Sequence, residues 1–139
     1  MRFDNRFFQK KKFEPRTIKK YFNGALKDFK IAFKNNNPEV IFIFSYLALV
    51  KIGITLVAFS GYKIKSRTGH HIKILEKLSQ ILNNNDIEII GDKMRKKRNL
   101  DLYEGGIIIS AKEAKEYLNF VQEVIDKAER YLKSQNSLF

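Results

Sequence analysis

The chain has 139 residues, enough for one domain with a single hydrophobic core and too few for two ordinary domains. Its 27 Lys and Arg against 15 Asp and Glu give a formal net charge of +12, which favours RNA, DNA or an anionic membrane surface as partner. The lack of cysteine excludes disulfides and thiolate metal sites and fits a reducing cytosol, so we expect a cytoplasmic protein. With only two histidines, we expect no metal and no other cofactor.

Residues 1–16 predict a basic arm ahead of the folded domain. Six Lys and Arg side chains stand there among four phenylalanines, without the apolar stretch or the cleavage site of a secretory signal. We expect a loosely ordered arm in which Lys10, Lys11 and Lys12 bind nucleic acid. The phenylalanines either stack on bases or pack on the domain, and packing is the more common role of an aromatic side chain.

Two helices are predicted next. Residues 17–34 carry an apolar stripe at helical spacing, which ends at three consecutive asparagines. Asn37 then caps a second helix that begins at Pro38 and runs to about Ser60, where Gly61 ends it. The stripe of the first helix consists of Ile18, Phe22, Ala25, Leu26, Phe29 and Phe33.

The second helix is apolar on all sides, which leaves two interpretations open. Between Val40 and Phe59 the only charge is Lys51, and this stretch is long enough to span a bilayer. A membrane-associated protein, anchored by this helix and steered to lipid by the basic arm, is therefore one alternative. However, the other predicted helices have apolar stripes that need a partner. We therefore expect the second helix at the centre of a bundle, and we expect no membrane partner.

Three more helices complete the predicted fold. One covers 70–82, with Ile74, Leu75, Leu78 and Leu82 facing inward, and the next covers 86–103 and ends before Gly105. Ser110 and Glu113 form an S-x-x-E capping box for the last helix, whose apolar face continues to residue 132. We interpret 107–109 as an extended connector, since no second strand is evident. The predicted fold is all-α: a four-to-five-helix up-and-down bundle over 17–133, with a short tail at 134–139.

The most informative side chains lie near the end of the fourth predicted helix. Arg95, Asn99 and Tyr103 fall on one line of a helix, and Arg98 lies beside them. Guanidinium groups next to an amide and a phenol suit phosphate or nucleotide binding. The alternative is a solvated basic face, which most basic runs form. On the binding interpretation, the nucleic-acid contacts come from Arg95, Lys96 and Lys97.

Several of these features together resemble the HEPN superfamily over about residues 17–133. They are the apolar second helix that ends in Gly61-Tyr62, the loop 63–71, and the Arg98-Asn99 pair near the end of a later helix. The resemblance implies a small helical bundle, a homodimer with a shared basic cleft, and one component of a toxin–antitoxin or defence system. It also implies a nucleotidyltransferase-type protein as a possible partner.

The family resemblance also assigns catalytic roles to Arg98, Asn99 and Tyr103. Many members are metal-independent ribonucleases in which an Arg holds the scissile phosphate and a His, four to six residues later, transfers a proton. In this chain Tyr103 stands where those members have the His. A phenol is a poor base at pH 7, although it donates hydrogen bonds and stacks on bases. We therefore expect RNA or nucleotide binding without strong catalysis, with a metal-independent endoribonuclease as the alternative.

Two other groups near the motif have a structural and a functional interpretation. His70 and His71 would supply the missing proton-transfer group if their loop folded back onto the motif. Next to Gly69, we expect them instead to begin the third helix. Asp101 and Glu104 have no third acidic or His partner in the sequence pattern, so we expect surface ion pairs rather than a metal site.

Overall fold

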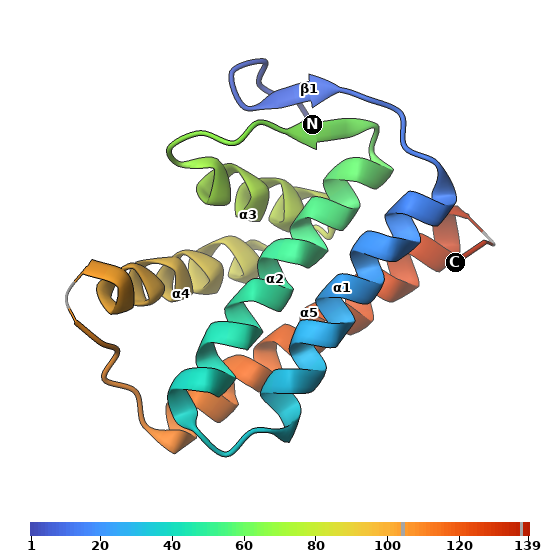
Figure 1. Cartoon of the computed structure of the whole chain (residues 1–139). Coiled ribbons are helices and arrows are strands. Elements are labelled where there is room, and N and C mark those ends of the chain that lie inside the picture. The colour runs from blue at the N-terminus through green and yellow to red at the C-terminus, as the bar shows by residue number, and fades with distance from the viewer. Residues whose placement is uncertain (104, 137) are drawn as a thin grey trace.

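The computed structural model describes residues 1–103, 105–136 and 138–139, and the side chains of residues 101–103 also lie outside the description. Figure 1 shows α1, α2 and α5 side by side, with a hairpin of α3 and α4 set at an angle against α2. The all-α bundle predicted from the sequence is confirmed. Within the described residues the elements are β1 (Phe8–Lys10), α1 (Pro15–Lys34), α2 (Pro38–Phe59), β2 (Tyr62–Ile64), α3 (His70–Ile81), α4 (Asn85–Tyr103) and α5 (Ala111–Gln135).

The apolar helix α2 is the centre of the bundle. It contacts α1, α3, α4 and α5. It is long and apolar enough to cross a membrane, but 61% of its most apolar 18-residue window is buried inside the protein. The expectation of a helix at the bundle centre is thus confirmed. Its fully buried side chains include Phe42, Tyr46, Leu49, Ile52 and Leu56.

The one charge within the apolar stretch of α2 is paired across the helix interface. Lys51 Nζ lies 2.6 Å from Asp28 Oδ2 of α1. Asp28 is only 7% exposed and occupies the buried face of α1. Because the ion pair joins two neighbouring helices, it favours the packing of α2 in the protein over its insertion in lipid.

One residue of the predicted stripe on α1 does not face the core. Phe33 is 67% exposed, whereas Ala25 and Ala32 are fully buried. The buried face is centred on the line of these two alanines, and Phe33 lies beyond its edge because 3.6 residues per turn carry the stripe gradually around the helix. The ring of Phe33 instead stacks on Phe29, with 6.2 Å between the ring centroids.

The helix ends follow the predicted caps, with one correction. Asn37 Oδ1 accepts a hydrogen bond from the Glu39 N–H at 2.9 Å, and Ser110 Oγ accepts one from the Glu113 N–H at 3.0 Å. The second half of the predicted capping box is wrong. The Glu113 carboxylate lies 2.6 Å from Lys97 Nζ, because an ion pair with α4 is within its reach. At the other end, α5 continues beyond residue 132 to Gln135.

The N-terminal segment differs most from its prediction. Rather than a loose arm, it contains β1, which pairs antiparallel with β2 and places Phe8 opposite Ile64. Phe8 is 3% exposed, and Phe3 stacks on Tyr62 with ring centroids 4.0 Å apart. The phenylalanines of this segment therefore pack on the domain. The pairing escaped prediction because three-residue strands carry almost no alternating pattern, and because these two lie more than fifty residues apart in the sequence.

Candidate functional site

Helix α4 brings the basic motif next to two polar side chains of the core. Tyr46 of α2 and His71 of α3 share a hydrogen bond of 2.8 Å between the hydroxyl and Nδ1. The positive charges of Arg98 and Arg95 of α4 lower the pKa of both groups. We call these four residues, contributed by three helices, the Arg98 cluster.

Burial keeps the Tyr46–His71 pair neutral at pH 7. Burial raises the pKa of Tyr46 to about 12, and the positive charges of Arg98 and Arg95 only partly oppose this increase. Burial also lowers the pKa of His71 to about 4, helped by the charges of His70, Arg98 and Arg95. The cluster therefore combines two permanent cations with a neutral phenol and a neutral imidazole.

The predicted nucleic-acid contacts on α4 are each paired with a carboxylate. Arg95 Nε donates a hydrogen bond of 2.9 Å to Asp92 Oδ1, and Lys96 Nζ lies 3.2 Å from Asp92 Oδ2. Burial raises the pKa of Asp92, but the hydrogen bonds from Arg95 and Lys96 outweigh it and hold this pKa below its usual value. Lys97 is paired with Glu113 of α5. These pairs lower the positive charge that α4 offers to a ligand.

Arg98 differs from its neighbours on the helix. It is half-buried, and none of the ion pairs found among the described side chains includes it. Asn99 is also half-buried on α4. Tyr103 closes the helix, and its side chain lies outside the described residues, so its predicted place beside Asn99 stays a prediction.

The other predicted contacts, Lys10, Lys11 and Lys12, lie at the end of β1 and in the segment that follows it. All three are exposed. Figure 1 places α3 between β1 and α4, so these lysines belong to a different surface from the Arg98 cluster.

Two members of the cluster were not predicted as site residues. Tyr46 belongs to the apolar second helix and was not singled out, and His71 was expected to begin the third helix, with proton transfer beside the motif as the alternative. His71 does lie in the first turn of α3, and from there it also reaches Tyr46. The hydroxyl of Tyr46 could have indicated a polar neighbour from the sequence alone, because a buried phenol usually has a hydrogen-bond partner.

The described residues contain no group of three or more His, Asp or Glu side chains arranged to hold a metal ion. No protein-family model matches the chain, and no curated protein or solved structure matches it either. The HEPN resemblance therefore rests on the sequence features given above.

Proposed function

We propose that this protein binds RNA or a nucleotide in the cytoplasm, as a HEPN-like component of a toxin–antitoxin or defence system. The observation that carries the proposal is the hydrogen-bonded Tyr46–His71 pair, on whose ionisation the positive charges of Arg98 and Arg95 act. Guanidinium groups donate paired hydrogen bonds to phosphate oxygens, and aromatic rings stack on bases. A homodimer that joins two clusters in one basic cleft, and a nucleotidyltransferase-type partner protein, are parts of this proposal.

The protonation states of the cluster favour binding over cleavage. With a pKa of about 4, His71 is seldom protonated at pH 7 and is a weak proton acceptor. With a pKa of about 12, Tyr46 releases its proton less readily than an ordinary phenol. Neither group is matched to proton transfer near neutral pH, whereas both remain available as hydrogen-bond partners.

A metal-independent endoribonuclease is the second candidate, and the position of His71 favours it. The cluster holds an imidazole, the group that the sequence motif lacks at Tyr103. A bound phosphate would raise the pKa of His71 through its negative charge and so improve its match to proton transfer. His71 would then accept the proton of the RNA 2'-hydroxyl as that oxygen attacks the phosphorus. The bond from phosphorus to the 5'-oxygen breaks, the 5'-oxygen takes a proton from water, and a 2',3'-cyclic phosphate remains.

Substitution of Arg98 tests the binding proposal. We expect Arg98→Gln to weaken the binding of a fluorescently labelled 12-nucleotide RNA about tenfold or more, because a charge-assisted pair of hydrogen bonds is lost. The measurement is fluorescence anisotropy in buffer with EDTA. Lys93→Gln is the matched control, since it removes one exposed charge from the same helix. Equal losses in the two variants would contradict a specific role for Arg98.

Analysis of the RNA ends separates the two candidate functions. Binding without strand cleavage by the wild type supports the binding proposal. Cleavage that leaves 2',3'-cyclic phosphate ends and is lost in both Arg98→Gln and His71→Gln would instead establish the ribonuclease.

A further inference from the structure

The N-terminal segment and the loop after α2 form a short ribbon on the surface of the bundle. β1 and β2 pair antiparallel, with Gln9 opposite Lys63. Backbone N–H groups of Lys65 and Lys11 donate to the opposite strand at 2.7 and 2.9 Å, which continues the pairing beyond both ends of the ladder. We call residues 1–14 and 61–69 the basic ribbon.

The ribbon has an aromatic inner side and a basic outer side, because successive residues of a strand point in opposite directions. On the inner side, Phe8 is buried and its ring centroid lies 5.1 Å from that of Phe3, which in turn stacks on Tyr62. These ring contacts join the two segments of the ribbon, and the burial of Phe8 indicates that this side faces the domain. Lys11 and Lys63 are exposed and are left toward solvent.

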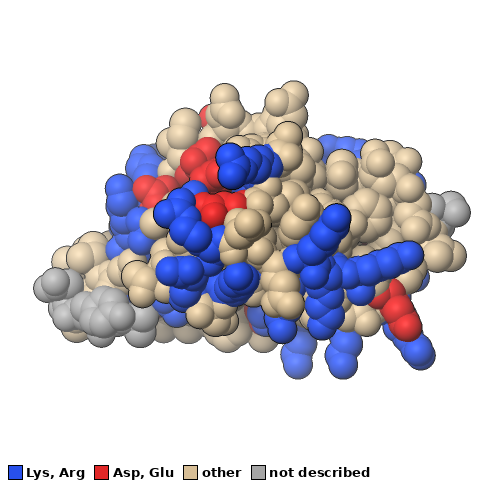
Figure 2. Space-filling model, turned by 90° about the horizontal axis from the view of Figure 1, so that it is seen from above, with Lys and Arg blue, Asp and Glu red and all other residues tan. Residues whose placement is uncertain are grey.

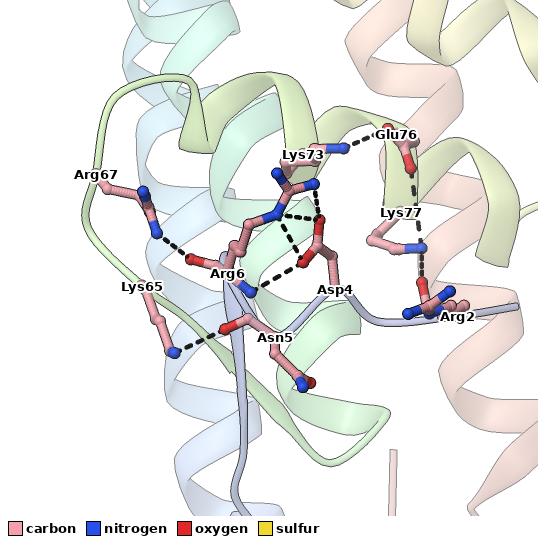
Figure 3. A network of polar contacts seen from close by, with 9 residues as sticks. All are labelled: Arg2, Asp4, Asn5, Arg6, Lys65, Arg67, Lys73, Glu76 and Lys77. Carbon is pink, nitrogen blue, oxygen red and sulfur yellow. Dashed lines mark hydrogen bonds and ion pairs between the residues drawn. The ribbon is translucent and has the colours of Figure 1, made fainter.

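Two charged side chains of the ribbon are held by neutral carbonyl groups. Lys65 Nζ donates to the carbonyl oxygen of Asn5 at 2.7 Å, and Arg67 Nη1 donates to that of Arg6 at 2.8 Å (Figure 3). A carbonyl orders the side chain without cancelling its charge. The three paired basic side chains of α4 are different, because carboxylates neutralise them.

Helix α3 fixes the beginning of the segment. Lys77 is 4% exposed, and its ammonium group donates to the carbonyl oxygen of Arg2 and, at 3.0 Å, to Gln80 Oε1. The same ammonium lies 5.1 Å from the centroid of the Phe3 ring. The ribbon is thus attached at several points, so its backbone occupies a defined position before a ligand arrives.

Positive charge dominates the ribbon. Residues 1–14 and 61–69 contain eight Lys and Arg but only two acidic residues, Asp4 and Glu14. Asp4 is already paired with Arg6, at 3.0 Å. Figure 2, which views the molecule from the side of β1 and β2, shows Lys and Arg side chains spread over this face and few Asp and Glu among them.

We propose that the basic ribbon binds the sugar-phosphate backbone of RNA as a second surface, separate from the Arg98 cluster. Lysines on an extended ribbon suit contacts to phosphates that do not depend on base sequence, because each ammonium is a compact point charge. This inference rests on the proposed RNA-binding function and names the surface that supplies most of its salt-dependent affinity. The Arg98 cluster then makes the shorter-range contacts.

The composition of the ribbon favours RNA over an anionic membrane. Stable membrane attachment requires an apolar anchor in addition to basic charge. Among the large apolar side chains that the structure describes as exposed, only Met1 belongs to the ribbon. The aromatic side chains of the ribbon are all half-buried or buried.

The test compares two triple variants of equal net charge. The ribbon variant is Lys11→Gln, Lys12→Gln and Lys63→Gln, and the control is Lys19→Gln, Lys27→Gln and Lys30→Gln on α1. All six lysines are exposed. Affinity for a 12-nucleotide single-stranded RNA is measured between 50 and 200 mM KCl, with circular dichroism melts to verify folding. If the ribbon triple is unstable, Lys63→Gln alone against Lys27→Gln keeps the comparison.

We expect the ribbon triple to weaken binding at least tenfold at 100 mM salt and to reduce the slope of log K against log salt by about 2, since up to three phosphate contacts are lost. The control triple should change affinity less than threefold. Equal effects of the two triple variants, or loss of binding only with Arg98→Gln, would contradict RNA binding by the ribbon and leave the proposed RNA-binding function of the protein intact. A wild type that does not bind RNA would overturn both, and ribbon-dependent binding to phosphatidylserine vesicles would then assign this surface to lipid.

Discussion

His71 links the candidate site to the stability of the protein. Its pKa is about 4 in the folded protein, against a reference value of 6.5 for an exposed imidazole. Between these two values the unfolded chain binds more protons, so acidification favours unfolding. The contribution of neutral His71 to stability is complete above pH 6.5 and is lost as the pH falls toward 4.

Because acidification favours unfolding, stability should depend on pH between 6.5 and 5, which is above the range in which most carboxylates titrate. We expect the free energy of unfolding to fall by about 1 kcal/mol over this range, after allowance for the partial exposure of the ring. Urea denaturation at the two pH values measures the change. His71→Phe should remove most of it, while His70→Gln should retain it. An unchanged slope in His71→Phe would show that another group is responsible.

The contact between α1 and α2 depends on one ion pair with unequal burial. The side chain of Asp28 is 10% exposed, whereas that of Lys51 is 45% exposed. Loss of the lysine therefore leaves a buried carboxylate without its partner, while loss of the carboxylate leaves an ammonium that reaches water.

We expect Lys51→Met to lower the free energy of unfolding by about 1–3 kcal/mol and Asp28→Asn to lower it by less than 1 kcal/mol. The double variant should regain part of the loss, since no unpaired charge remains in it. Urea denaturation of the three variants measures these differences. A larger cost for Asp28→Asn would contradict the burial of the carboxylate.

The helices could be predicted because their signals are local. The apolar stripe of α1 and the caps at Asn37 and Ser110 each depend on residues a few positions apart, and the predicted ends lie within a few residues of the observed ones. The contacts of Asp92 with Arg95 and Lys96 have helical spacing and were equally visible in the sequence.

The ribbon and the Arg98 cluster depend on contacts that sequence spacing does not reveal. Tyr46 and His71 are 25 residues apart, and the strands of the ribbon are farther apart still. Tertiary contacts also decide which basic side chains have a carboxylate beside them that neutralises their charge, as the pairing of Lys97 with Glu113 shows. Composition predicted a basic protein, and only the fold distinguishes the neutralised charges of α4 from those of the ribbon.

For the whole molecule, the structure places two different cationic surfaces on one compact bundle. One is the Arg98 cluster, in which Arg95 is paired with Asp92 and the phenol and imidazole are neutral, and the other is the extended basic ribbon. Figure 1 shows that the ribbon occupies one end of the fold, with α3 between it and α4. RNA that contacts both surfaces would have to pass along α3.

Photo-crosslinking of 4-thiouridine RNA to the wild-type protein, with the crosslinked peptides identified by mass spectrometry, tests this account most directly. We expect crosslinks in two groups of peptides, one from α4 around Arg98 and one from the ribbon around Lys11 and Lys63. Competition with unlabelled RNA should abolish both groups, and Arg98→Gln should reduce the first more than the second. Crosslinks confined to α1 and α5, or no crosslinks that unlabelled RNA competes away, would contradict the account.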